Sequence, residues 1–249
     1  METQILYAGD TSLTTAASYL AGVMKNFGLK FDYIPSGVRM PEHLLQTPRR
    51  LYILSDYSAS DIPEFCTQTI LHNVRAGAGL LMLGGWESYH GKGGDYHKSP
   101  LADALPVHIS QMDDRVNSAQ PCLVQKLADH PILEHLPFEN PPGIGGYNRI
   151  EPKQNTVTIL GARHFQVDFD GSVFRFTQGE LAPLLVLGRY GKGRTAALAT
   201  DAAPHWVGGM VDWGNTRTIS RAPQAEGIEV GNWYAQFFHQ LINWTIADR

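Results

Sequence analysis

Short apolar segments alternate with helical patterns over the first hundred residues. Three predicted strands cover residues 5–10, 31–34 and 51–56. Between the first two, apolar residues recur at helical spacing over residues 13–27, and Gly28 offers the left-handed conformation that ends a helix. A second helix is predicted from about Asp61 to Arg75, with its stop at Gly77. This order of strands and helices indicates βαβ units and therefore a parallel sheet.

The next segment, residues 79–83, is apolar at every position rather than at alternate positions. A strand covered on both faces, as in the middle of a parallel sheet, has this pattern. It is followed at once by a loop rich in glycine, histidine and aromatic residues, which runs from Gly84 to Pro100. We expect this loop to be the working surface of the protein, because ligands bind at the carboxyl ends of parallel strands.

The second half of the chain has a different pattern, in which short strands are separated by Pro- and Gly-rich stretches. Its predicted strands cover residues 107–110, 156–160, 184–190 and 194–201. Gly191-Lys192-Gly193 lies between the last two and is predicted to form a hairpin turn. Residues 207–228 have little periodicity and are predicted to form a long loop or lid, and residues 230–246 the last helix. No repeat or clear linker divides the chain, so a single domain, residues 1–249, is expected.

The composition is that of an ordinary globular protein, with 43% hydrophobic and 18% charged residues, and it excludes extensive disorder. The formal net charge is −4 and no run of Lys or Arg occurs, so neither nucleic acid nor a membrane surface is an expected partner. Two separate cysteines fit a reducing compartment better than a disulfide framework. Because the N-terminal residues lack the features of a signal peptide, a cytoplasmic location is expected.

Three motifs, taken together, resemble a known family. They are Arg75-Ala76-Gly77-Ala78-Gly79 through Gly85-Trp86, Tyr89-His90-Gly91-Lys92-Gly93-Gly94-Asp95-Tyr96 with Ser99-Pro100-Leu101, and Arg189-Tyr190-Gly191-Lys192-Gly193-Arg194 through Asp201-Ala202-Ala203-Pro204-His205-Trp206. The combination resembles the family described as putative glutamine amidotransferase, in the class I glutamine amidotransferase-like superfamily. ThuA-like proteins and the trimerisation domain of some β-galactosidases are related to it. The resemblance covers most of the chain and is weakest over residues 207–228.

The resemblance implies a flavodoxin-like parallel sheet with helices on both faces. Together with the βαβ order and the predicted hairpin turn, the expected fold is a doubly wound, mostly parallel α/β sheet with a C-terminal β-hairpin. A site would then lie at the carboxyl ends of the strands, where four predicted strand ends converge. These ends are Asp10, Asp56-Tyr57, Gly84-Gly85-Trp86 and Asp201.

An active class I glutaminase has a Cys nucleophile on a sharp turn after a strand, a His that activates it and an acidic residue that orients the His. In this sequence the turn falls at Gly84 or Gly85, neither of which has a side chain. Cys66 lies among apolar residues of a predicted helix, and Cys122 follows Pro121 outside the predicted sheet, so both are interpreted as structural. The resemblance therefore predicts a fold, and cysteine-dependent glutaminase activity is not expected.

The leading hypothesis is a domain that binds a small polar molecule at the strand ends and needs no cofactor. Acidic side chains there favour a ligand with hydroxyl or amine donors over a phosphate, and the aromatic side chains can stack on a sugar or another planar ligand. The expected ligand-binding residues are Asp10, Asp56, Tyr57, Gly84, Gly85, Trp86, His90, Asp95 and Trp206, together with Asp201 and His205.

Two other functions remain open. One is hydrolysis, for which a serine-based mechanism would use Ser88, His205 and Asp201. A metal-assisted mechanism would hold a divalent ion such as Zn²⁺ among His90, Asp95, His97, Asp201 and His205. The other function is a non-catalytic oligomerisation module, in which the aromatic residues of these loops lie between copies of the chain, and a homo-oligomer is left open.

Overall fold

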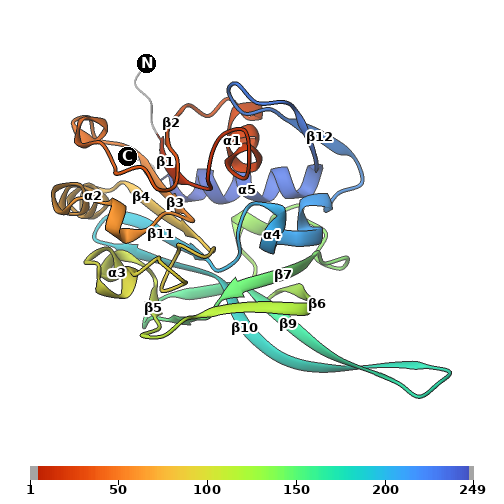
Figure 1. Cartoon of the computed structure of the whole chain (residues 1–249). Helices are drawn as coiled ribbons and strands as arrows, with labels where there is room; N and C mark the ends of the chain where they lie inside the picture. Colours follow the sequence, from red (N-terminus) through yellow and green to blue (C-terminus); the bar gives the residue numbers. More distant parts are fainter. Residues whose placement is uncertain (1–4, 247–249) are drawn as a thin grey trace.

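A nine-stranded mixed sheet forms the centre of the structure, a computed structural model that describes residues 5–246 (Figure 1). In spatial order its strands are β2 (Phe31–Ile34), β1 (Ile5–Gly9), β3 (Leu51–Ser55), β4 (Gly79–Leu83), β11 (Gly193–Leu198), β10 (Phe174–Tyr190), β9 (Val157–Phe169), β6 (Arg115–Lys126) and β7 (Gly143–Asn148). The first five are parallel, and each of the last four is antiparallel to its neighbours. The parallel half has the flavodoxin-like order β2-β1-β3-β4.

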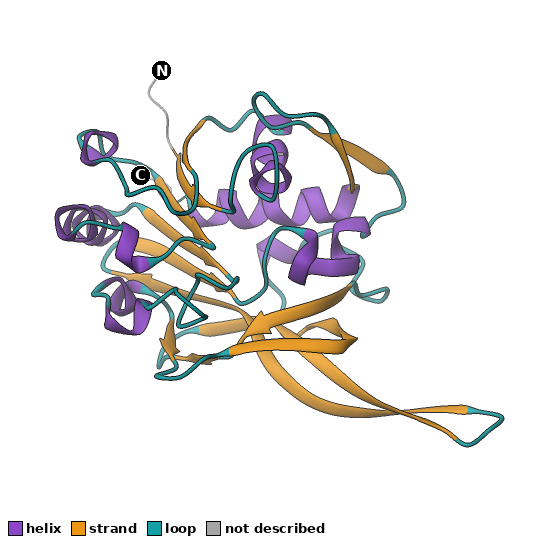
Figure 2. Ribbon diagram, in the orientation of Figure 1, coloured by secondary structure: helices purple, strands orange, loops and turns teal. Residues whose placement is uncertain are grey.

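Helices cover both faces of the parallel half (Figure 2). α1 (Ala17–Asn26) connects β1 to β2, and α2 (Glu64–Ala76) connects β3 to β4 in the opposite direction across the sheet. Since such crossovers are right-handed, the two helices lie on opposite faces. The C-terminal helix α5 (Asn232–Thr245) packs beside α1 and contacts β4 and β11. Within residues 5–246, no helix has the length and apolar character needed to cross a membrane.

Short helical segments lie in the connections. They are the α-helical turns α3 (Leu101–Ala104) and α4 (Pro204–Val207), and 3-10 turns at Glu42–Leu45, Ala59–Asp61, Tyr96–Lys98, Pro131–Leu133 and Gly208–Asp212. The 3-10 turn at Tyr96–Lys98 lies in the loop Gly84–Pro100, and α3 follows it and contacts α2 and the strand at residues 107–109.

The parallel half forms where the sequence pattern places it. Every residue of β1, β3 and β4 is buried, as expected for strands that are apolar on both faces. Each large aliphatic side chain buried in this way contributes about 1.5–3 kcal/mol. Helix α2 ends where Gly77 adopts a φ of +131°, a conformation that costs other residues more than glycine. The predicted α/β class, these strands and the stop of α2 are therefore confirmed.

The predicted turn at Gly191–Gly193 is also confirmed, because it joins β10 to β11 as an antiparallel hairpin. In the same half, residues 107–110 form a strand, β5 (Val107–Ile109), but it pairs with β8 (Ile150–Pro152) in a separate two-stranded sheet. The pattern does not predict β6 or β7. Cys122 lies in β6, inside the central sheet, so its expected place outside the sheet is wrong.

The prediction of a long loop or lid over residues 207–228 is wrong. In this segment β12 (Arg217–Ser220) forms a hairpin with β13 (Ile228–Gly231), which also takes the residues expected to begin the last helix. Trp213 and Ser220 are buried, and β12 packs on α1. The segment is ordered by contacts with distant parts of the chain, which local periodicity does not report.

Strands β9 and β10 continue beyond the body of the molecule as a two-stranded arm, defined here as residues 165–178 (Figure 1). The arm is joined to the sheet through a β-bulge between Gln178 and Leu181. Both strands are longer than the sequence pattern predicts, because that pattern marks only their inner, buried parts.

Candidate functional site

The carboxyl ends of β1, β3, β4 and β11 meet at one edge of the sheet. Asp10 follows β1, Asp56 follows β3, Gly84 follows β4, and Asp201 lies three residues beyond β11. The chain leaves β1 in one direction and β3 in the other, so a switch point of the topology lies between these two strands. Asp10 and Asp56 flank this point, which is the usual ligand-binding crevice of such sheets.

Asp10 is a buried carboxyl group close to Asp56 and Asp201. Its side chain accepts hydrogen bonds from the phenol of Tyr7 and from the hydroxyl of Ser55, which is 2.9 Å away. Burial raises the pKa of Asp10 strongly, and the negative charges of Asp201 and Asp56 raise it further. The two hydrogen bonds lower this pKa, but by less. The group is therefore held at the site in a setting that disfavours its ionised form.

Asp56 ties the end of β3 to the loop that follows β4. Its Oδ1 accepts a hydrogen bond from the backbone N–H of Glu87 at 2.5 Å, and its own N–H donates to Oγ of Ser88 at 2.9 Å. Burial raises the pKa of Asp56, although the N–H groups of Glu87 and Trp86 and the nearby His205 oppose this effect. The backbone of Asp56 has a φ of +48°, in the left-handed region that Asp tolerates better than most residues.

Asp201 is only 6% exposed, and its Oδ1 accepts a hydrogen bond from the N–H of Ala203 at 2.9 Å. Burial is the largest cause that raises the pKa of Asp201 to about 7, and the charge of Asp56 acts in the same direction. The carboxyl group therefore gains and loses its proton near neutral pH. A carboxyl group tuned in this way, inside a cleft, is typical of sites that bind or transfer protons.

A cavity of about 470 Å³ opens beside these carboxyl groups. It is lined by Thr11, Ala16, Asp56, Trp86, Glu87, Lys92, Asp201, Ala203 and His205. The rings of Trp86 and His205 meet edge to face, with 5.8 Å between their centres. Carboxyl groups that accept hydrogen bonds and aromatic rings therefore line the same cavity.

The turn after β4 has no room for a side chain. A Cβ atom at Gly84 would lie 1.9 Å from the carbonyl oxygen of Ala199, and one at Gly85 would lie 2.5 Å from Oδ1 of Asp56. Both glycines are therefore required by close contacts. At the position where the superfamily's nucleophile is expected, the backbone of Gly84 therefore contacts the backbone of Ala199, and the backbone of Gly85 contacts the carboxylate of Asp56.

Asn148, at the end of β7, holds this turn from the antiparallel half. Its Oδ1 accepts the N–H of Gly85 at 3.0 Å, and its Nδ2 donates to the carbonyl of Gly85 at 3.1 Å and to Oδ1 of Asp114 at 2.8 Å. Asp114 also accepts the N–H groups of His90 and Gly91, each at 3.0 Å. Because Asn148 and Asp114 are buried, these bonds fix the loop firmly.

The two cysteines of the chain lie elsewhere and are both buried. Cys66 is in α2 and Cys122 is in β6. Burial raises the pKa of both thiols, which disfavours the thiolate that a nucleophile requires.

The model of the family described as "Putative glutamine amidotransferase" matches residues 51–220, more than half of the chain. The chain belongs to this family. The match confirms the resemblance that the three sequence motifs predict, and it includes β4, the glycine turn and Asp201. No curated protein matches the chain.

Solved structures show the same fold. The cytoplasmic protein STM3548 of Salmonella typhimurium has a TM-score of 0.71 at 19% identity, with 99% of this chain and 100% of that chain covered. The cytoplasmic protein STM1381 of Salmonella typhimurium LT2 has a TM-score of 0.71 at 24% identity, with 97% and 98% covered. A protein of Bacteroides uniformis described as putative ThuA-like has a TM-score of 0.55 at 12% identity, with 97% and 89% covered. Identities this low establish the fold alone.

In this member of the family, four of the residues singled out from the sequence line the cavity together. They are Asp56, Trp86, Asp201 and His205. Gly84 and Gly85 form the turn that leads to Trp86, and Asp10 lies beside the two lining aspartates as a buried neighbour.

Ser88 and Tyr57 do not line the cavity. Ser88 is 1% exposed, and its hydroxyl accepts the N–H of Asp56, so it supports the loop instead of presenting an accessible oxygen. The buried hydroxyl of Tyr57 donates to the carbonyl of Val38 at 2.6 Å. Both side chains anchor backbone segments around the strand ends.

Trp206, His90 and Asp95 also lie outside the lining. Trp206 is buried against Gly146, where a Cβ atom would lie 2.4 Å from Cδ1 of its ring, so that glycine makes room for the indole. His90 stacks on His97, with 4.3 Å between the ring centres. The half-exposed Asp95 is paired with Lys98 at 3.1 Å. Of the three histidines expected as metal ligands, His90 and His97 thus stack on each other while His205 lines the cavity, and residues 5–246 contain no group of three or more His, Cys, Asp or Glu side chains that could hold a metal ion.

Sequence reasoning missed several residues of the site. The lining residues not predicted are Thr11, Ala16, Glu87, Lys92 and Ala203. Most of them follow a predicted strand end or lie in the loop expected to form the working surface, so extending each strand end by a few residues would have found them. Asn148 and Asp114 gave no such signal, because the strand that carries Asn148 is not predicted.

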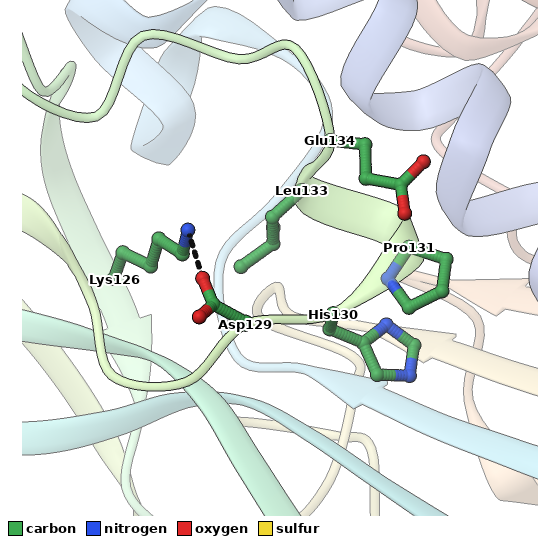
Figure 3. A pocket seen from close by; sticks show the side chains of 6 residues that line it. All are labelled: Lys126, Asp129, His130, Pro131, Leu133 and Glu134. Carbon is green, nitrogen blue, oxygen red and sulfur yellow. Dashed lines mark ion pairs between the residues drawn. The ribbon is translucent and has the colours of Figure 1, made fainter.

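Two further cavities lie away from the strand ends. One is lined by Lys126, Asp129, His130, Pro131, Leu133 and Glu134, and there the ammonium of Lys126 and the carboxylate of Asp129 pair with each other at 2.5 Å (Figure 3). The other, of about 590 Å³, includes Lys153, whose ammonium donates to the carbonyls of Ala102 and Leu105. In these two cavities Lys126, Asp129 and Lys153 are held in contacts within the chain.

Proposed function

We propose that the protein binds a small polar molecule with hydroxyl or amine donors in the cavity at the strand ends. The observation that carries this proposal is that the carboxyl groups of Asp56 and Asp201 and the rings of Trp86 and His205 line one cavity of about 470 Å³. Carboxylates accept hydrogen bonds but do not donate them, so they match hydroxyl and ammonium groups. The aromatic rings offer an apolar surface for the carbon skeleton of such a ligand.

The charge of the lining favours a neutral or cationic ligand over a phosphate. Asp56, Glu87 and Asp201 are acidic, and Lys92 is the one Lys or Arg among the lining residues. The ammonium of Lys92 lies 5.9 Å from the centre of the Trp86 ring, and the guanidinium of Arg115, outside the lining, lies 4.5 Å from it and pairs with Asp113. The net charge of −4 for the whole chain repels anions in the same sense.

Three matched sugars separate these ligand classes, because glucose, glucosamine and glucose 6-phosphate share a ring and differ in one substituent. At neutral pH and millimolar concentration, glucosamine should raise the melting temperature of the protein, glucose should raise it less, and glucose 6-phosphate should leave it unchanged. Asp56→Asn should weaken glucosamine binding about 10–100-fold, since a hydrogen bond to a charged group contributes about 1.5–3 kcal/mol.

Asp95→Asn is the matched control, because Asp95 is a half-exposed carboxylate in the loop after β4 that does not line the cavity. It should bind glucosamine as the wild type does. Stabilisation by glucose 6-phosphate alone, or by none of the three sugars, would contradict the proposal.

A second candidate function is hydrolysis by acid–base catalysis. It is favoured because the pKa of Asp201 is about 7 and His205 lines the same cavity. With Ser88 buried, the attacking group would be a water molecule that gives its proton to Asp201. Release of nitrophenol from p-nitrophenyl esters or glycosides should then increase as pH rises through about 7 and should be lost in Asp201→Asn. Equal rates in the variant and the wild type would exclude this role for Asp201.

We further propose that the protein does not hydrolyse glutamine through a cysteine and that its ligand site works without a cofactor. Two buried thiols and a glycine turn support the first point. A cytoplasmic location is supported by the two Salmonella proteins of the same fold. The acidic net charge supports a partner other than nucleic acid or a membrane.

A further inference from the structure

The arm, residues 165–178, has one apolar face and one polar face. In its antiparallel register, Phe169 lies opposite Phe174 and Val167 lies opposite Phe176. Residues directly opposite each other project from the same face, and alternate residues of a strand share a face. One face therefore consists of Phe165, Val167, Phe169, Phe174 and Phe176 with Gln178 at its inner end, and the other face of Gln166, Asp168, Arg175 and Thr177.

The apolar face is open to solvent. Phe169, Phe174 and Phe176 are 57%, 61% and 69% exposed, and Val173 in the turn is 56% exposed. Phe169 and Phe174 stack on each other, with 4.6 Å between ring centres, but nothing covers their outer surface within residues 5–246. Figure 2 shows the arm as two strands that project away from every helix.

The same face continues toward the body of the molecule. A Cβ atom at Gly161 would meet Cδ1 of Leu181 and Cδ1 of Leu127, so these leucines lie on the face to which Phe165 belongs by alternation along β9. Leu127 is 39% exposed. By the same alternation Arg163 lies between Gly161 and Phe165 on this face, where its guanidinium donates to Oε1 of Gln125 and to the carbonyl of Gly179, so the leucines form a second apolar area separated from the arm.

Such a surface needs a partner for physical reasons. A two-stranded hairpin without a third layer is marginally stable in water. Full burial of a Phe side chain removes about 150–250 Å² from water, so the three rings at their observed exposure present on the order of 350 Å² of apolar surface. On an extended arm, an apolar surface of this kind marks an interaction site.

We propose that the arm is a self-association element that packs, apolar face to apolar face, on the arm of a second copy of this chain. A two-fold arrangement buries the rings of both copies, which gives on the order of 700 Å² from the rings, and Phe165, Val167 and Val173 of each copy bring the total toward the roughly 1,000 Å² of a specific interface. The charges of the arm argue against a polyanionic partner. Arg175 is paired with Asp170 at 2.7 Å and Asp168 adds a further negative charge, so the arm offers no free cation to a nucleic acid or an anionic lipid.

Sedimentation velocity over a concentration series tests the proposal. The wild type should form dimers, whereas the double variant Phe169→Thr, Phe176→Thr should sediment as a monomer, with a dimer dissociation constant raised on the order of 100-fold or more. Thr keeps the preference for a strand while it removes the aromatic ring. Ile219→Thr is the matched control, because Ile219 is 62% exposed on β12, far from the arm in sequence, and its variant should dimerise as the wild type does.

Hydrogen exchange of the wild type keeps the proposal testable if the double variant misfolds. Amides of residues 165–178 should become more protected as protein concentration rises, since pairing suppresses opening of the arm. A wild type that stays monomeric, with an arm equally unprotected at all concentrations, would overturn the proposal and leave another protein or a lipid surface as the occupant. A dimer that persists unchanged in a folded double variant would overturn it as well.

Discussion

Replacing Asp201 with Asn should stabilise the folded protein above neutral pH. The Asp201 carboxyl is 6% exposed, and burial is the largest cause that raises its pKa from 3.8 to about 7. The pKa of Asp201 is thus raised by about three units, and each unit corresponds to about 1.4 kcal/mol. Ionising this carboxyl group in the folded protein therefore costs about 4 kcal/mol more than ionising it in the unfolded chain. Asn retains an oxygen that can accept the N–H of Ala203 but carries no charge.

The direction of the pH dependence follows from the same difference. The folded chain keeps the proton of Asp201 up to about pH 7, whereas the unfolded chain releases it near 3.8. Between these values the folded state binds more protons, so this group lowers the free energy of unfolding as pH rises. The difference between Asp201→Asn and the wild type should grow from near zero at about pH 4 to at most about 4 kcal/mol at about pH 8.

Urea unfolding, followed by tryptophan fluorescence at several pH values, measures this difference. Asp170→Asn is a control of opposite sign, because the N–H groups of Val173 and Ser172 lower the pKa of Asp170, so the stability it contributes is present at neutral pH and is lost as pH falls. An Asp201→Asn variant that is less stable than the wild type at alkaline pH would show that the ionised Asp201 does not destabilise the fold. A difference that does not change with pH would contradict the prediction too.

Two other predictions concern the glycine turn and the thiols. Gly84→Ala should lower the free energy of unfolding by about 3 kcal/mol or more, because its Cβ atom would lie 1.9 Å from the carbonyl oxygen of Ala199. Gly37→Ala, with a φ of +73° and nothing within 4 Å of its Cβ, should cost only about 1–2 kcal/mol in the same urea titration. Neither Cys66 nor Cys122 should react with dithiobis(nitrobenzoate) in the folded protein, since both are buried and their pKa values are raised, and both should react in urea. Fast labelling of the native protein would show that a thiol is accessible.

The parallel half of the fold could be predicted because its signals are local. Each of β1, β3 and β4 is a continuous apolar segment, and each ends at an Asp or Gly that the sequence displays directly. The carboxyl ends of adjacent parallel strands must lie together, so Asp56, Trp86, Asp201 and His205 could be assigned to one place without any knowledge of distances.

The antiparallel half could not be predicted in the same way. Its long strands are half exposed and carry a bulge, so neither alternation nor a continuous apolar segment marks their full length. Tyr57 and Trp206 show the limit for single residues. Both are aromatic and lie beyond a strand end, yet both are buried. Trp206 packs on Gly146 and donates to Oδ1 of Asn117, whereas Trp86 is 39% exposed and lines the cavity.

The close contact between Gly85 and Asp56 explains both why the turn after β4 carries no nucleophile and why an acidic group lies there. A Cβ atom at Gly85 would lie 2.5 Å from Oδ1 of Asp56, so the carboxylate fills the space that a side chain on this turn would need. Asp56 is held there from two sides, because the N–H of Glu87 binds the same oxygen at 2.5 Å and Oγ of Ser88 accepts the N–H of Asp56. A Cys at the turn would therefore require the loss of Asp56 and of the bonds that shape the loop. The strand ends of this chain therefore carry hydrogen-bond acceptors where a glutaminase carries a thiolate. A ligand that binds there has to offer hydrogen-bond donors.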